Sequence, residues 1–162
     1  MRRAGVAVAG AVGGVLLLSG CGAELLPLAA VRLDASGAPQ AVLRPCGDDL
    51  IHGLSLTGAP AEEDSDRNLS GWKVPGERHG SDAEFPLFEP PAAWRAQAVG
   101  QQRVIPTYSY RLAFGKGESD YEYTGLVTFR AADLAALEPG HVWADGRAMS
   151  LGEFEELAED SC

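Results

Sequence analysis

The clearest pattern along the chain is an alternation of apolar and polar residues over 107–129. Every second residue is aromatic or aliphatic, and the alternation resumes after a glycine-containing turn at 115–120. The apolar positions are Tyr108, Tyr110, Leu112 and Phe114, followed by Tyr121, Tyr123, Val127 and Phe129. A period of two is typical of a strand with one buried face, so these two runs predict an antiparallel hairpin.

Shorter apolar runs before this hairpin predict further strands. Two of them, over 31–34 and 40–44, flank a turn at 35–39, and a third covers 51–57. Farther along, the pattern predicts a short strand over 72–74, a turn-rich loop over 75–82, an extended segment over 84–88 and a helical turn within 91–99. Prolines in and after the extended segment confine it to the edge of a sheet.

The C-terminal part of the chain changes to a helical pattern. A short helix is predicted over 131–137, followed by a hairpin over 142–149 that turns at Asp145-Gly146. Ser150 and Glu153 form a capping box, which predicts a helix over 151–160. Its buried stripe comprises Leu151, Phe154, Leu157 and Ala158. Together these elements predict a mainly β fold, a small antiparallel β-sandwich or open barrel with one C-terminal α-helix.

The N-terminal pattern is different. Arg2 and Arg3 precede an apolar run over 4–18, which is shorter than the roughly 20 residues of a spanning helix. The run ends in Leu-Leu-Ser-Gly-Cys at 17–21, which resembles the lipobox of bacterial lipoproteins. The resemblance implies a diacylglyceryl group on the sulfur of Cys21 and cleavage between Gly20 and Cys21.

The resemblance also divides the chain and places it in the cell. It implies a signal peptide over 1–20, a lipidated tether over 21–29 and a single β-rich extracytoplasmic domain over 30–162. Basic residues are 11 Arg against 2 Lys, a bias that resembles the lipoproteins of actinobacteria. We therefore expect an anchor on the outer face of the cell membrane. The tether contains Leu25, Leu26 and Leu28, which are expected to pack on the domain or on the edge of the bilayer.

Charge narrows the choice of partners. The full chain has 13 basic and 23 acidic residues, and removing residues 1–20 takes away two basic ones, giving 11 − 23 = −12. Such an acidic domain is repelled by the phosphates of nucleic acids. It is also repelled by anionic lipid, so the lipid group has to supply the membrane attachment. The expected partner is an envelope protein or a glycan such as peptidoglycan, and a small solute is the alternative.

Three cysteines are present in the chain. If Cys21 carries the lipid, Cys46 and Cys162 remain. Outside the cytoplasm, two remaining cysteines most simply form a disulfide. Two free thiols or an intermolecular bond are the alternatives.

An acidic run before residue 69 is the one stretch with the spacing of a metal loop. It comprises Glu62, Glu63, Asp64 and Asp66. Asp64, Asp66 and Asn68 match the first three ligands of a calcium loop. However, Leu69 replaces the required glycine and Pro75 the required glutamate. We therefore expect a solvated surface loop here, and no metal or cofactor.

Residues suited to catalysis are scattered. His52, His79 and His141 have no metal-ligand spacing. Residues 53–58 resemble the nucleophile elbow of serine hydrolases, but the second glycine of the motif comes one residue too late. The three tryptophans are expected in the core more than against a sugar; they are Trp72, Trp94 and Trp143. The sequence thus assigns no catalytic residue.

These observations favour a lipid-anchored, non-enzymatic domain that binds a partner or associates with the envelope. Two alternatives remain open. One is an extracytoplasmic hydrolase that combines a histidine with acids from 62–66 or 118–122. The other is an accessory subunit of a membrane complex, which would dock through the acidic helix 151–160.

Overall fold

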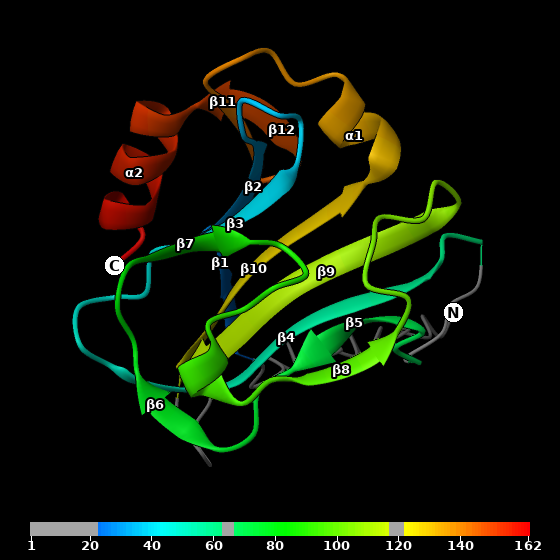
Figure 1. The fold of residues 1–162 in the computed structure, drawn as a ribbon. Helices are drawn as coiled ribbons and strands as arrows, with labels where there is room; N and C mark the ends of the chain where they lie inside the picture. Colours follow the sequence, from blue (N-terminus) through cyan, green and yellow to red (C-terminus); the bar gives the residue numbers. More distant parts are fainter. Residues whose placement is uncertain (1–22, 63–66, 117–121) are drawn as a thin grey trace, which may run out of the picture.

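Two β-sheets packed face to face make up the fold, and Figure 1 shows them in the computed structural model, which describes residues 23–62, 67–116 and 122–162. The larger sheet has the order β1-β10-β9-β4-β5-β8, with β6 paired to β4. Its strands are β1 (Glu24–Leu26), β4 (Leu50–Pro60), β5 (Ser70–Lys73), β6 (Glu77–His79), β8 (Gln97–Gly100), β9 (Tyr108–Lys116) and β10 (Tyr123–Arg130). The smaller sheet has the order β12-β11-β2-β3-β7.

The smaller sheet carries the C-terminal elements. Its strands are β2 (Ala29–Leu33), β3 (Pro39–Leu43), β7 (Ala83–Pro86), β11 (His141–Ala144) and β12 (Arg147–Ser150). Helix α1 (Ala131–Ala135) follows β10, and helix α2 (Leu151–Asp160) packs against β11 and β12. The described residues therefore confirm a small β-sandwich with one C-terminal helix, and neither sheet closes into a barrel.

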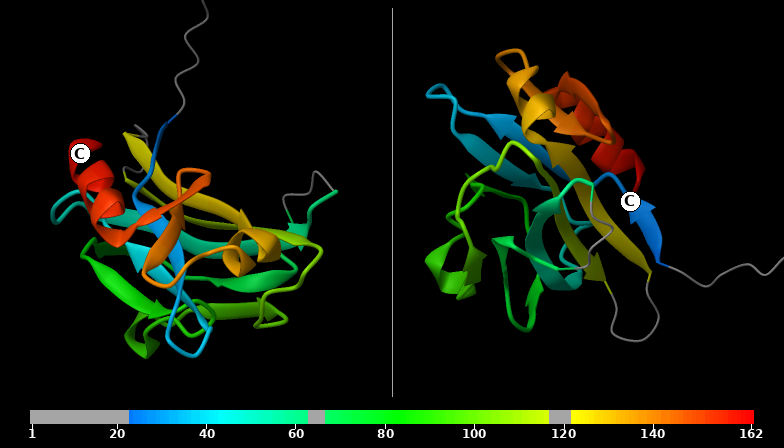
Figure 2. Two further views of the ribbon diagram at one scale, coloured as in Figure 1. Left: turned by 90° about the horizontal axis from the view of Figure 1, so that it is seen from above. Right: turned by 90° about the vertical axis from the view of Figure 1, so that its right-hand side faces the viewer.

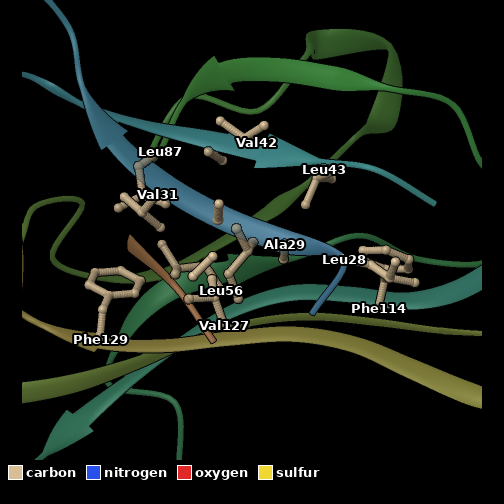
Figure 3. Packing of buried hydrophobic residues seen from close by; sticks show 14 of the residues in the cluster. Leu28, Ala29, Val31, Val42, Leu43, Leu56, Leu87, Phe114, Val127 and Phe129 are labelled. Atoms are coloured by element: carbon tan, nitrogen blue, oxygen red, sulfur yellow. The ribbon is translucent and has the colours of Figure 1, made fainter. Parts of the chain in front are cut away.

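The core lies between the two sheets. Side chains of the smaller sheet meet those of the larger one in a single apolar cluster, and Figure 3 shows part of it. The fully or almost fully buried members from the smaller sheet include Val31, Val42 and Leu43, and Leu28 lies just before its strand β2. Those from the larger sheet include Leu56, Leu112, Phe114, Val127 and Phe129. The burial of apolar surface between the sheets is the main force that holds them together.

The predicted central hairpin is confirmed as β9 and β10, whose described residues pair from Tyr123↔Lys116 to Arg130↔Ser109. Tyr121 lies outside the described residues. Within the hairpin, Gly125 is paired with Phe114, and a Cβ at Gly125 would lie 2.5 Å from the Phe114 ring. A side chain larger than hydrogen therefore does not fit beside this ring.

The segment expected to be a tether contains a strand and buried residues in its described part, residues 23–29. Glu24–Leu26 form strand β1, which pairs in parallel with β10 from Glu24↔Tyr123 to Leu26↔Gly125. Leu28 and Ala29 are then fully buried. The sequence concealed this strand because it is only three residues long and because Pro27 interrupts the run before β2.

Three short strands of the larger sheet also differ from the prediction. Strand β6 lies within the expected loop 75–82, and β8 follows a helical turn that covers only Ala92–Trp94. Strand β5 covers Ser70–Lys73, so it begins two residues earlier and ends one residue earlier than the predicted strand over 72–74. Such strands depend on their partners, β6 on β4 and β8 on β5, so local alternation does not indicate them.

The predicted third strand, 51–57, is part of a longer one. Strand β4 runs from Leu50 to Pro60 and contains a register shift between His52 and Ser55. Gly53 has a φ of +64° at this bulge, a conformation that favours glycine. The prediction stopped at residue 57 because Gly58 and Pro60 are residues that seldom occur inside a strand.

The C-terminal elements agree closely with the prediction. The β11–β12 hairpin turns at Asp145 and Gly146, both with positive φ, as a tight two-residue hairpin loop requires. Helix α2 has the predicted bounds, and Ser150 Oγ accepts a hydrogen bond from the Glu153 N–H while the Ser150 N–H donates to Glu153. The expected edge segment is β7, at the end of the smaller sheet.

Candidate functional site

The predicted lipidation and cleavage residues, Cys21 and Gly20, lie outside the described residues. The description begins at Ala23, and β1 starts at Glu24, three residues after Cys21. A chain extends by at most about 3.6 Å per residue, so the Cα of Glu24 lies within about 11 Å of the Cα of Cys21. Any group bound to Cys21 is therefore close to the start of β1.

An apolar groove of about 270 Å³ runs beside β1. It is formed where β1 and β10 approach the turn of the β11–β12 hairpin. The residues that line it are Leu25, Leu26, Pro27, Leu126, Val127, Thr128, Asp145 and Gly146. Leu25 is 66% exposed, more than any other large hydrophobic residue described. The leucines are evident in the sequence, but the groove is not, because β1 and β10, which form two of its walls, are more than 90 residues apart.

The predicted disulfide is present. Cys46, just after β3, is bonded to Cys162, just after α2, with the two Cα atoms 5.5 Å apart. The bond ties the C-terminal helix to the end of the smaller sheet. It also uses two of the three cysteines in the chain, which leaves Cys21 as the third.

Arg44 is the centre of an ion-pair network next to this disulfide. Its guanidinium donates to Glu84 at 2.8 Å and to Glu155 at 3.0 Å, and its Nε lies 3.7 Å from a carboxylate oxygen of Asp82. Burial alone would lower the pKa of Arg44, but the hydrogen bonds with Glu84 and Glu155 outweigh it and raise that pKa. The same hydrogen bond from Arg44 is the main reason why the pKa of Glu84 is lowered.

A larger groove of about 450 Å³ borders this network. Its lining comprises Arg44, Pro45, Gly47, Asp82, Glu155, Ala158, Glu159 and Cys162. The one arginine is already paired with carboxylates, so the groove is acidic in balance. Glu155 was expected to face water; it is exposed, but its carboxylate also holds Arg44.

A second polar cluster lies at the end of the larger sheet where β1 begins. Lys116 Nζ lies 3.1 Å from Asp49 and 2.7 Å from Glu122. The Tyr123 hydroxyl donates to Asp49 and accepts from the Cys46 N–H, each at 3.4 Å. Burial raises the pKa of Tyr123. The cluster connects β10 to the loop that carries the disulfide.

The histidines lie on different strands. His52 is on β4, where its ring lies near Gly115. His79 is on β6, and its Nδ1 lies 3.1 Å from the Asp48 carbonyl oxygen. His141 is on β11, and its buried Nδ1 has no hydrogen-bond partner in the structure. Ser55 lies within β4, paired with strands on both sides, and not at the strand-to-helix turn of a nucleophile elbow. Of the acids that the hydrolase hypothesis names, only Glu62 and Glu122 are among the described residues.

The tryptophans have structural contacts. Trp72 is 1% exposed and donates its Nε1–H to the Leu87 carbonyl. Trp94 packs edge-on against Phe85, with the Arg78 guanidinium over its ring. Trp143 donates its Nε1–H to Thr128, one of the residues that line the apolar groove. Trp72 is therefore in the core, as expected, whereas Trp94 and Trp143 are half-buried and pack against it.

In the acidic loop, Glu63, Asp64 and Asp66 lie outside the described residues. Asn68 does not point to a metal: its Oδ1 accepts from the N–H groups of Gly58 and Ser70, and its Nδ2 donates to Leu56. In the described ranges, no cluster of three His, Cys, Asp or Glu side chains could hold a metal ion.

Two further findings bear on identity. No helix within the described part of the chain is long and apolar enough to cross a membrane. Comparison with protein-family models, with curated proteins and with solved structures found no match to this chain.

Proposed function

We propose that this protein is a lipid-anchored extracytoplasmic domain that acts as a non-enzymatic binding or envelope-associated module. The anchor is a diacylglyceryl group on Cys21, and the domain is held on the outer face of the cell membrane. The proposal starts from the lipobox resemblance at 17–21. The geometry of the folded part supports it in two ways.

The disulfide is the observation that carries the proposal. Disulfides persist in oxidising compartments and are rare in the cytosol, so the Cys46–Cys162 bond favours an extracytoplasmic location. The same bond leaves Cys21 as the one cysteine available for another chemistry. The distance from Cys21 to β1 is the second support, because a lipid at Cys21 would hold the domain directly at the membrane.

Membrane fractionation of a cysteine series tests the anchor. We expect Cys21→Ala to be released from the membrane fraction or to accumulate as an unprocessed precursor. The matched control is the double variant Cys46→Ser with Cys162→Ser, which removes the disulfide and should remain in the membrane fraction. If Cys21→Ala is processed like the wild-type protein and remains in the membrane fraction, the lipid anchor is refuted.

A protein or glycan partner is tested by crosslinking on intact cells. Charge reversal at Glu156 and Glu159 examines whether the acidic face of α2 contributes, since these side chains are exposed. Glu155 is a poor choice for this purpose because it also holds Arg44. A partner lost on charge reversal would favour the accessory-subunit role, and a partner that is retained would favour another surface of the module.

A further inference from the structure

Strand β1 is the outermost strand of the larger sheet and the first element after Cys21. It pairs with β10 on one side, and no described strand pairs with its other edge. The right-hand view of Figure 2 shows β1, in blue, at the periphery of the molecule beside β10. The surface nearest to the proposed lipid is therefore this edge and the side chains next to it.

This edge has one exposed apolar side chain, Leu25, next to the exposed Glu24. A single exposed leucine is ordinary on a protein surface, but Leu25 borders the groove that also includes Leu26, Pro27 and Leu126. Contact with a protein or with a membrane would cover Leu25 and the apolar wall of this groove. The few residues between Cys21 and Leu25 favour the membrane, because the proposed anchor is on Cys21.

Chain length limits how far this surface can be from the lipid. The Cα of Leu25 is four residues from that of Cys21, so the two lie within about 14 Å. The polar layer on each side of a bilayer is about 5–8 Å thick. Because β1 is paired to β10 and the following Leu28 is fully buried, β1 is fixed to the body of the domain.

We propose that the β1 edge, with Leu25 and the groove beside it, rests on the lipid surface and gives the domain one fixed orientation. This inference rests on the proposed anchor at Cys21. The anchor sets where the domain is attached, and the β1 edge sets which side of it faces the bilayer. The far side, with the β2–β3 turn, then points away from the membrane.

Charge agrees with this orientation. Among the residues that line the β1 groove only Asp145 is charged, and the exposed Arg147 follows it closely. By contrast, the groove at Arg44 has three carboxylates, from Asp82, Glu155 and Glu159. Anionic headgroups would repel that acidic groove more strongly than the β1 side, where Glu24 and Asp145 are the carboxylates and Arg147 is a cation.

Fluorescence quenching by labelled lipid tests the orientation. With Cys21 lipidated and the other two cysteines bonded, Leu25→Cys introduces a single free thiol that takes a bimane label. The matched control is Ser36→Cys, an exposed position in the turn between β2 and β3. Both lipidated proteins are reconstituted into phosphatidylcholine and phosphatidylglycerol vesicles that contain a headgroup nitroxide lipid.

We expect the label at position 25 to be quenched several-fold more strongly than the label at position 36. Equal quenching in protein that floats with the vesicles would overturn the orientation and leave the anchor intact. Failure of both proteins to float would instead reject the anchor. If a short bismaleimide crosslinks Leu25→Cys into a dimer and lipid quenching is absent, the edge binds a second copy and the lipid contact is wrong.

Discussion

Cys46 and Cys162 are joined by a disulfide across 116 residues of sequence, with their Cα atoms 5.5 Å apart. The bond connects the end of β3 with the end of α2. It therefore fixes the C-terminal helix to the sheet that also holds β2, the strand that follows β1. The disulfide therefore joins the C-terminal residue of the given sequence to the smaller sheet of the domain.

Removing this disulfide should destabilise the fold without detaching the protein from the membrane. For a loop of this length the chain-entropy account gives a loss of about 4–5 kcal/mol in the free energy of unfolding. Urea titration of the Cys46→Ser, Cys162→Ser double variant measures it. Reduced wild-type protein is the control and should unfold at a similar urea concentration. Recovery of both cysteines as alkylated free thiols from unreduced native protein would contradict the bond.

The close approach of Gly125 to Phe114 makes a second prediction. Gly125→Ala places a methyl group against the Phe114 ring, and such overpacking should lower the free energy of unfolding by about 1–3 kcal/mol. Adding Phe114→Leu should recover part of the loss. Gly152→Ala is the matched control: nothing lies within 4 Å of its Cβ position in α2, so it should raise stability by up to about 1 kcal/mol. Equal effects of the two alanines would reject the packing argument.

The Arg44 network predicts a pH dependence. The pKa of Glu84 is below its ordinary value of 4.5 because Arg44 donates a hydrogen bond to it. A carboxylate with a lowered pKa in the folded state stabilises the protein above the unfolded-state pKa. This contribution is lost as the pH falls through the lower folded-state pKa. Arg44→Gln should therefore be less stable by about 1–2 kcal/mol at neutral pH and should show a shallower loss of stability below about pH 5.

Arg32→Gln is the matched control for this experiment. Arg32 pairs with the other oxygen of Glu84 at 2.7 Å, but its side chain is 37% exposed, against 14% for Arg44. An exposed ion pair contributes less than about 1 kcal/mol. Denaturant titrations across acidic and neutral pH compare the two variants with wild type. If Arg32→Gln lowers the free energy of unfolding as much as Arg44→Gln does, the argument that burial strengthens the Arg44 ion pairs is wrong.

The sequence predicted the parts of the fold that local patterns determine. The long alternation of β9 and β10, the Asp145-Gly146 turn and the capping box at Ser150 each appear where expected. The disulfide followed from counting cysteines once Cys21 was set aside. These features depend on residues close in sequence or on a single possible pairing.

Features that depend on distant neighbours were not predictable. Strand β1 exists because β10 offers it an edge, 99 residues farther along at Glu24↔Tyr123. Arg44 meets Glu155 across 111 residues. The groove beside Leu25 forms only when the β11–β12 turn packs next to β1. For this reason the sequence indicated a spacer where the structure has a strand, and the candidate surface could not be located from the sequence alone.

The mass of the N-terminal peptide of the natural protein tests the central claim most directly. After isolation of the protein from the membrane fraction, mass spectrometry should find a peptide that begins at Cys21 and carries a diacylglyceryl group on its sulfur. An unmodified peptide that still contains residues before Cys21, from protein dissolved in the cytosol, would contradict the account.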